Sequence, residues 1–385
     1  MKSANKTFAK TGTTIFEVTS RLAAEHGSIN LGQGFPDDNG PEDIRQKAAE
    51  YLEDRPNQYP PMLGVPELRQ AVAAHDKKFY GIDLNWENSV LVTAGATEAL
   101  ASCLFGLIEE GDEVIVIEPL YDSYLPIIRR AGGIPKLVRL LPPDWSLPKE
   151  ELAAAFSDKT KLIILNSPMN PCGKVFTADE LLFIAELIVK HDAYAVCDEV
   201  YEHLIFDDRK HIPLITMPGM NNRCLRIGSA GKIFSLTGWK IGFIVADPSL
   251  LQPVAKAHQF ITFTIVPNLQ RAVAYGLGKP DSFFANVASD MQAKRDLLSG
   301  LLSDIGFSVL PCGGTYFVTA DFSKLGFEGI DTEFCKTVTI EAGVTAIPVS
   351  AFYEGDSPRN FVRFAFCKNP SILQEAAARL ANYFR

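Results

Sequence analysis

Polar side chains that could act together follow four of the apolar runs in this chain. The four stretches are residues 93–97, 166–173, 198–201 and 229–232. Each one is ordinary by itself, because Gly-containing turns, Pro-rich turns, helix-capping carboxylates and exposed loop lysines are common in proteins. Their joint content is more specific, since it includes the amine of Lys232, the carboxylate of Asp198 and the amide of Asn170.

These groups together suit a cofactor that carries an aldehyde, a ring nitrogen, a phenolic oxygen and a phosphate. An amine can form an imine with an aldehyde, and a carboxylate can pair with a protonated ring nitrogen. The turn at residues 95–97 joins a predicted strand to a predicted helix. Its free N–H groups and the positive end of the helix dipole suit a phosphate. The four stretches therefore indicate pyridoxal phosphate (PLP).

The elements that must position these groups are short buried strands between helices. Continuous apolar runs predict strands at residues 89–93, 113–117, 161–165, 194–197, 223–227 and 241–245. Continuous rather than alternating apolarity indicates a sheet covered on both faces, hence a three-layer αβα domain with a mostly parallel sheet. Thr177, followed by Glu180, predicts the start of a helix that ends at Lys190. In such sheets ligands bind outside the carboxyl ends of the strands, where the four stretches lie.

The pattern of predicted helices and strands changes after about residue 280. A long amphipathic helix is expected at residues 290–305, with short strands at 307–310, 315–320 and 361–366 and a terminal helix. This pattern predicts a smaller α+β domain. We expect residues 41–280 to form the large PLP-binding domain, and residues 1–40 and 281–385 to form the small domain.

Composition excludes several functional classes. The formal net charge of −9 argues against nucleic acid as a partner, and no stretch of 18 apolar residues predicts a membrane span. Seven dispersed cysteines without a C-x-x-C pair predict buried thiols rather than disulfides or zinc. The six histidines form no i, i+4 pair beside a carboxylate, so no metal is expected. Without an apolar signal segment near the start, we expect a cytoplasmic protein.

The order of the motifs resembles that of the class I aminotransferases of PLP fold type I. The motifs are Asn-x-Pro-x-Asn-Pro-x-Gly at 166–173, Asp-Glu-Val-Tyr at 198–201, Ser-x-x-Lys followed by Gly-Trp-Lys-x-Gly at 229–242, and Val-Arg-Phe at 362–364. The resemblance covers residues 30–363. Three further segments, 31–37, 57–59 and 347–352, are most similar to the kynurenine, glutamine and methionine aminotransferase branch. N-succinyldiaminopimelate aminotransferases share many of these sequence motifs.

The resemblance implies a role for each residue around the cofactor ring. Lys232 would be the Schiff-base lysine, which also carries a proton between the substrate Cα and the cofactor. Asp198 would keep the pyridine nitrogen protonated. Asn170 and Tyr201 would hydrogen-bond the phenolic oxygen, and Tyr121 would stack on the ring.

The resemblance also implies how the phosphate is bound. Ala96, Thr97, Ser229 and Lys240 would contact it, and Tyr59 would reach over from a partner subunit, so a homodimer with shared active sites is expected. Many relatives of the aspartate type have arginine where this chain has Lys240. A lysine supplies a point charge without bidentate geometry, which would hold the phosphate less rigidly.

For the substrate, the resemblance assigns Arg363 as the clamp on the α-carboxylate, because a planar guanidinium suits a planar carboxylate. Gly34 would add a backbone contact, and Asn170 would touch the same carboxylate. The expected lining of the side-chain pocket is Ile15, Phe16, Tyr121 and Phe263. Enzymes of the aspartate type add a second arginine from the partner, but residues 259–267 contain no basic side chain. A dicarboxylate specialist is therefore disfavoured.

The expected activity is transfer of the amino group of a neutral L-amino acid, such as a methionine-, glutamine-, aromatic or kynurenine-like one, to a 2-oxo acid by a ping-pong mechanism. Two alternatives keep the cofactor: a β-lyase acting on cysteine conjugates or cystathionine, and an N-succinyldiaminopimelate aminotransferase. A third is a regulatory protein that reuses the fold. A regulatory protein of this kind requires an added DNA-binding domain. We do not expect one here, because the motifs begin by residue 30 and too few residues precede them.

Overall fold

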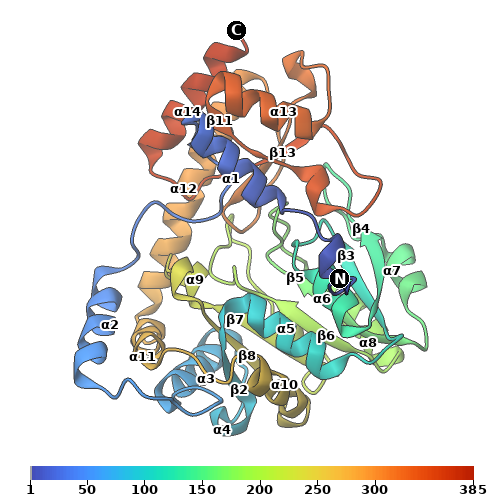
Figure 1. Cartoon of the computed structure of the whole chain (residues 1–385), viewed down its shortest axis with the longest axis vertical. Helices are drawn as coiled ribbons and strands as arrows, with labels where there is room; N and C mark the ends of the chain where they lie inside the picture. The colour runs from blue at the N-terminus through green and yellow to red at the C-terminus, as the bar shows by residue number, and fades with distance from the viewer. Residues whose placement is uncertain (1) are drawn as a thin grey trace.

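The computed structural model describes residues 2–385, which form a large αβα layer structure and a smaller α+β part (Figure 1). The central seven-stranded sheet has the order β2-β8-β7-β6-β5-β3-β4. Strand β8 runs antiparallel to the other six strands, which are parallel to one another. The strands are β2 (Val90–Ala94), β3 (Glu113–Glu118), β4 (Ile134–Arg139), β5 (Thr160–Asn166), β6 (Tyr194–Asp198), β7 (Cys224–Ser229) and β8 (Ile241–Ala246).

Helices cover both faces of this sheet, which is why its strands are continuously apolar. In β3, Val114 and Val116 pack in the core beneath α5, whereas Ile115 and Ile117 pack on the opposite face with α8. The helices of this part are α2 (Glu42–Asp54), α3 (Pro66–Tyr80), α4 (Trp86–Ser89), α5 (Gly95–Leu107), α6 (Tyr124–Ala131), α7 (Lys149–Ala155), α8 (Ala178–Lys190), α9 (Ala230–Ile233), α10 (Pro248–Ile261) and α11 (Pro267–Leu277).

The smaller part is built on a four-stranded sheet of order β12-β13-β10-β9. A second, two-stranded parallel pair joins β1 to β11, so the beginning of the chain is part of a sheet formed with its end. The strands are β1 (Ile29–Asn30), β9 (Ser308–Val309), β10 (Phe317–Asp321), β11 (Val344–Thr345), β12 (Ile347–Pro348) and β13 (Phe361–Ala365). The helices are α1 (Ile15–His26), α12 (Asp281–Ile305), α13 (Asp331–Thr337) and α14 (Pro370–Tyr383).

Short helical turns complete the description: Phe8–Lys10, Leu214–Thr216, Thr237–Trp239, Ser323–Leu325, Val338–Ala342 and Val349–Phe352. Within residues 2–385 no helix is long and apolar enough to cross a membrane.

The predicted αβα layering and the six predicted strands of the large sheet are confirmed, with ends shifted by no more than two residues. Helix α8 also begins as predicted, since Thr177 and Glu180 form a capping box. The edge strand β4 was not predicted, because it is half exposed and includes Pro135 and Lys136. Helix α12 begins at Asp281 rather than at residue 290. The domain division at residues 40 and 280 stays a prediction.

Candidate active site

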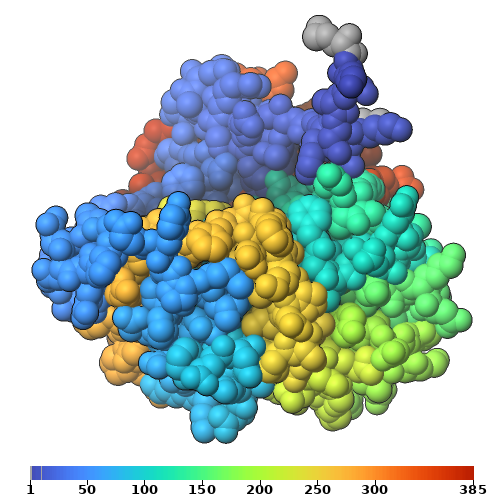
Figure 2. Space-filling view, turned by 60° about the horizontal axis from the view of Figure 1, so that its bottom comes forward, coloured from blue at the N-terminus to red at the C-terminus, as the bar shows by residue number. Residues whose placement is uncertain are grey.

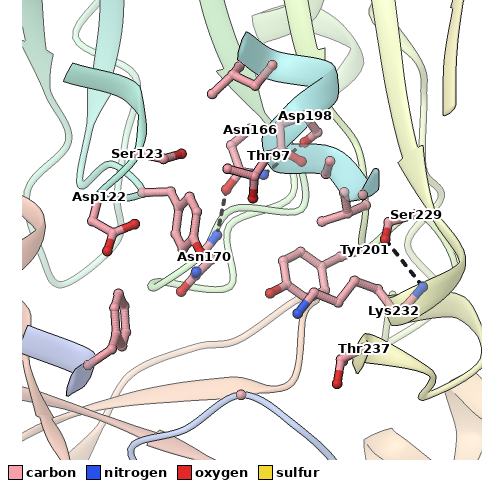
Figure 3. A pocket seen from close by; sticks show the side chains of 18 of the residues that line it. Thr97, Asp122, Ser123, Asn166, Asn170, Asp198, Tyr201, Ser229, Lys232 and Thr237 are labelled. Carbon is pink, nitrogen blue, oxygen red and sulfur yellow. Dashed lines mark hydrogen bonds between the residues drawn. The ribbon is translucent and has the colours of Figure 1, made fainter. Parts of the chain in front are cut away.

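A cavity of about 390 Å³ lies where the carboxyl ends of β5, β6 and β7 face the small sheet. Its walls come from both parts of the molecule, since Asp198 and Ser229 end strands of the large sheet while Phe317 and Arg363 lie on β10 and β13. Figure 3 shows Asn170, Tyr201 and Lys232 around one common space. The topology therefore gathers around one cleft side chains that lie more than 300 residues apart in sequence, such as those of Phe16 and Arg363.

Lys232 lies on the short helix α9, directly after β7. Ser229 caps this helix by accepting a hydrogen bond from the N–H of Gly231 at 3.3 Å. The Lys232 Nζ donates to the hydroxyl of Tyr316 at 2.6 Å. Burial lowers the pKa of Lys232 to about 8, because removal from water disfavours the ammonium form. About half of this amine is therefore in the neutral form, which acts as a nucleophile and a base, near pH 8.

Asp198 ends β6 and points to the same cavity. The hydroxyl of Tyr124 donates to its Oδ2 at 2.6 Å, whereas its Oδ1 is buried without a hydrogen-bond partner among the described residues. Burial raises the pKa of Asp198, and the bond from Tyr124 opposes that effect. A buried carboxylate oxygen without a partner is costly. A protonated ring nitrogen beside Oδ1 would supply the missing donor.

The turn after β5 connects Asp198 to the other side of the cavity. Asn166 donates through Nδ2 to the carbonyl of Asp198 at 2.8 Å and accepts through Oδ1 from the N–H of Asn170 at 2.9 Å. The peptide bonds before Pro168 and Pro171 are both cis. This turn fixes the Asn170 side chain at the mouth of the strand (Figure 3).

Arg363, on β13, is 1% exposed and is held at two points. Its Nη1 donates to Asn170 Oδ1 at 2.8 Å, and its Nη2 donates to the carbonyl of Gly32 at 2.5 Å. The guanidinium lies 3.7 Å from the centroid of the Phe317 ring. Burial lowers the pKa of Arg363 to about 10, so the group remains positively charged at neutral pH.

Two tyrosines add aromatic walls. The Tyr201 ring packs edge-on to Tyr316, with centroids 5.2 Å apart, and burial raises the pKa of its hydroxyl. Tyr121 lies 6.3 Å from the Phe16 ring, and burial raises the pKa of Tyr121 to about 12. Both hydroxyls are therefore neutral hydrogen-bonding groups at neutral pH.

The start of α5 forms a cradle for an anion. Gly95 has φ +74°, and a Cβ there would lie 3.1 Å from the Nζ of Lys240, so the ammonium group lies against the helix start. Ala96 and Thr97 follow in the first turn, and all line the cavity. Glu98 supports this turn, because its Oε2 accepts from the N–H of Ala94 at 2.9 Å. A helix N-terminus next to a lysine is a favourable place for a phosphate.

Of the residues predicted from sequence, most line this one cavity: Phe16, Gly34, Ala96, Thr97, Tyr121, Asn170, Asp198, Tyr201, Ser229, Lys232, Lys240 and Arg363. Three predicted residues do not line it. Ile15, at the start of α1, is half-buried at the edge of a core cluster that includes Ile347 and Phe352. Tyr59 and Phe263 contact each other on the surface, with ring centroids 5.7 Å apart.

Sequence reasoning missed Tyr316, which accepts from Lys232 and donates to the carbonyl of Gly34. A signal was present, because Gly313-Gly314-Thr315 precedes it and such small residues before a strand often mark a close backbone approach. Tyr124 was also missed. Its position as the first residue of the amphipathic helix α6 carries no sign that its hydroxyl reaches Asp198 on another element.

Comparison with known proteins places this chain in a family. The model of the family "Aminotransferase class I and II" matches residues 27–380. A probable N-succinyldiaminopimelate aminotransferase of Mycobacterium tuberculosis is 42% identical, over 96% of either chain. The methionine aminotransferase of Escherichia coli is 39% identical, over 96% of this chain and 95% of its own. A kynurenine–oxoglutarate transaminase of Dictyostelium discoideum is also 39% identical, over 95% of this chain and 93% of its own.

Solved structures agree with these matches. The N-succinyldiaminopimelate aminotransferase of Mycobacterium tuberculosis superposes with a TM-score of 0.96 at 41% identity, over 99% of this chain and 100% of that one. The methionine aminotransferase YbdL of Escherichia coli gives the same TM-score at 37% identity and the same coverage. An aspartate aminotransferase of Thermus thermophilus gives a TM-score of 0.90 at 27% identity, over 99% of this chain and 100% of that one.

Proposed function

This chain belongs to the class I and II aminotransferase family and is a PLP-dependent transaminase, and from that premise we propose which residues do the chemistry and on what substrate. The proposed donor is an L-amino acid with an uncharged side chain, and the acceptor is a 2-oxo acid. One observation supports this most directly: the Lys232 amine and the Arg363 guanidinium line the same cavity, beside an anion cradle. The spacing of amine, carboxylate clamp and cradle suits an α-amino acid next to a phosphorylated cofactor.

The residues present fit PLP. Asp198 offers an unpartnered buried oxygen, and the start of α5 with Lys240 offers a cradle for a phosphate. Bound PLP supplies an aldehyde carbon that joins the substrate amine and a ring that withdraws electrons from the substrate Cα. We assign Asn170 and Tyr201 to the phenolic oxygen, Tyr121 to the ring face, and Ala96, Thr97, Ser229 and Lys240 to the phosphate.

Lys232 has two tasks in this proposal, to hold the cofactor and to move a proton. Its pKa of about 8 leaves a substantial fraction neutral at physiological pH, so Nζ can accept the proton from the substrate Cα. With the cofactor bound, the same Nζ would be placed to return that proton on the face of the cavity that Lys232 occupies. Tyr316 limits where Nζ can lie, because its hydroxyl is itself held by the carbonyl of Gly34.

Arg363 orients the substrate by binding its α-carboxylate with two N–H groups. The bonds to Asn170 and Gly32 fix the guanidinium before substrate arrives, which reduces the entropy that binding must overcome. Gly34 adds a backbone contact on the same side. With the carboxylate fixed, the Cα–H bond can face Lys232.

The remaining wall of the cavity supports an uncharged side chain. Phe16, Tyr121 and Phe317 contribute apolar surface there. The cations among the lining residues are Lys232, Lys240 and Arg363, and all three already have a role. A distal carboxylate would therefore find no basic partner within this chain's cavity. Relatives named for methionine and kynurenine fit this reading.

A substrate panel tests the proposal. The PLP-loaded enzyme is mixed with L-methionine, L-glutamine, L-phenylalanine, L-kynurenine, L-aspartate or N-succinyl-L,L-diaminopimelate, each in turn without an oxo acid. The cofactor absorbance should change fastest with one of the four uncharged side chains, and a 2-oxo acid should reverse the change. Fastest reaction with aspartate or with the succinylated substrate would refute the side-chain class. Release of pyruvate and ammonia from a cysteine conjugate, without any oxo acid, would indicate the β-lyase instead.

We also propose a homodimer with shared active sites. A surface patch, called here the aromatic patch, combines Tyr59 (85% exposed), Phe260 (83%), Phe263 and Val266. Figure 2 shows this face, where the blue segment around residue 60 meets the gold segment around residue 260. Large exposed apolar groups of this kind are typical of subunit interfaces. In a dimer, Tyr59 would extend toward the partner's phosphate cradle.

The seven cysteines are all buried and free, which suits a reducing compartment such as the cytoplasm. We propose that location. Retention of activity in a cytosolic fraction, and its absence from a membrane or secreted fraction, is the corresponding measurement.

A further inference from the structure

A second cluster of chemically active side chains lies behind the active site, between α3 and the turn after β6. It contains His75, Glu202 and His203, and one ligand atom from each lies within 4.8 Å of the others. None of the three lines the active-site cavity. We propose that this cluster binds a divalent transition-metal ion of the Zn²⁺ type, as a structural site separate from the PLP site.

The donor set suits such an ion. Two imidazole nitrogens and one carboxylate oxygen are ligands that Zn²⁺ prefers, with water in a remaining position. The Nε2 atoms of His75 and His203 are 2.8 Å apart. Ligand nitrogens bound to a tetrahedral zinc ion at about 2.0–2.1 Å lie about 3.3 Å apart, so the two rings must separate by about 0.5 Å. Small rotations of the imidazole rings would achieve this.

Glu202 provides independent support, because half of its carboxylate is unused. Its Oε2 accepts from the Tyr80 hydroxyl at 2.6 Å and is paired with Arg226. Its Oε1 is buried and has no hydrogen-bond partner among residues 2–385. A buried carboxylate oxygen left unpaired costs free energy, and an ion or water usually explains it. A bound cation would give this oxygen a partner.

The charged side chains around Arg226 also favour a bound cation. This guanidinium is fully buried and pairs with three carboxylates, those of Asp76, Glu199 and Glu202. His211 contacts Glu199 from the far side at 2.8 Å. The three acidic side chains are at most 3% exposed and share this one guanidinium. A cation bound at Glu202 would therefore lie in negatively charged surroundings, which favour it.

The surroundings fit a structural rather than a catalytic ion. The rings of Phe79 and Phe284 pack against both histidines, with centroids between 4.5 and 5.2 Å apart. His203 is the partly exposed member and offers a route of entry. The ion would join α3 to the turn that begins directly after Asp198 and includes Tyr201. It would therefore brace two cofactor-site residues from behind.

The test uses untagged, PLP-loaded enzyme dialysed against metal-free buffer, followed by addition of Zn²⁺ or Co²⁺ and gel filtration. We expect one tightly held metal ion per chain by elemental analysis, and Co²⁺ should give the visible absorption of a low-coordinate nitrogen and oxygen site. His203→Gln and His75→Gln should each lower the retained metal at least tenfold. His26→Gln, on the exposed end of α1, is the matched control and should retain wild-type metal content.

The proposal is overturned if the wild type retains no metal after excess Zn²⁺, or if His203→Gln retains as much as His26→Gln. PLP absorbance and far-ultraviolet circular dichroism show whether each variant is folded. Should both cluster variants fail to fold, X-ray absorption of the Zn²⁺-loaded wild type decides. Two imidazoles in the first coordination sphere support the site, whereas sulfur ligation would place the ion on cysteines and refute it.

Discussion

At the scale of single residues, the Lys232 amine depends on a short hydrogen-bond chain. Nζ donates to Tyr316, and Tyr316 donates to the carbonyl of Gly34. These hydrogen bonds link helix α9 of the large part to the residue before β10 in the small part and to the amino-terminal segment. The position of the proposed base is therefore set by three separate elements.

Replacing Lys232 by alanine should abolish turnover. Loss of a positioned acid–base group alone typically lowers the rate about 10²- to 10⁴-fold, and loss of the covalent attachment adds to this. The measurement is kcat with the best amino donor of the panel. Lys324→Ala, an exposed lysine elsewhere, is the control and should keep wild-type activity. A Lys232→Ala variant within tenfold of wild type would contradict the assignment.

Capture of PLP by the cofactor-free enzyme should depend on pH. Only the neutral amine attacks an aldehyde, and the pKa of Lys232 is about 8. The capture rate should therefore rise about tenfold per pH unit below pH 8 and level off above it. Absorbance after rapid mixing measures the rate. A profile that still rises at pH 10, near the ordinary lysine pKa, would show that the amine is not buried as the structure has it.

Tyr316→Phe should shift that profile. The hydroxyl accepts a hydrogen bond from Nζ, which favours the ammonium form, so its removal should lower the pKa of Lys232 further. The plateau of PLP capture should then begin at a lower pH than in the wild type. Tyr383→Phe, which loses a surface hydroxyl that donates to Glu341, is the matched control. An unchanged profile would mean that Tyr316 supports the site by packing only.

At the scale of elements, strand ends and helix starts do the positioning. The four stretches singled out in the sequence all lie at carboxyl ends of β2, β5, β6 and β7, where a sheet covered on both faces brings them together. The convergence of these four stretches could be predicted because continuous apolar runs mark buried strands. Contacts such as Tyr124 with Asp198, or Lys232 with Tyr316, join elements that are remote in sequence, and residue spacing carries no information on them. The half-exposed strand β4 was missed for lack of an apolar run.

Gly242→Ala should weaken PLP binding. A Cβ at residue 242 would lie 2.6 Å from the backbone carbon of Gly95, so the start of α5 would have to move away from β8. Hydrogen bonds to charged groups contribute about 1.5–3 kcal/mol, so the PLP dissociation constant should rise about 10- to 100-fold. Equilibrium dialysis measures it. Gly238→Ala, where nothing lies within 4 Å of the added carbon, should bind PLP as the wild type does, and equal affinities in both variants would contradict the cradle.

At the scale of the whole molecule, the aromatic patch is the surface that the single chain leaves unexplained. Tyr59 was predicted to complete a partner's phosphate site, and in the single chain it lies outside the cavity against Phe263. A residue that serves a neighbouring subunit cannot be placed by the contacts of its own chain.

Phe260→Glu should separate the subunits. Because this side chain is 83% exposed in the single chain, the substitution should leave folding intact while placing a charge in the proposed interface. Light scattering should give about twice 42.3 kDa for the wild type and about 42.3 kDa for the variant. Lys324→Glu, remote from the patch, should remain dimeric. A wild type that is monomeric at every concentration would refute the dimer.

The parallel pairing of β1 with β11 has a consequence for biosynthesis. Ile29 and Asn30 of β1 pair with Val344 and Thr345. Directly after β1, Leu31 accepts from the N–H of Ala365 and Gly32 accepts from Arg363, so this segment binds residues that are translated more than 300 positions later. While the ribosome is still at work, residues 29–34 have no partner to pair with. The proposed substrate clamp is thus completed only after nearly the whole polypeptide has been made, and a truncated translation product cannot display the proposed carboxylate site.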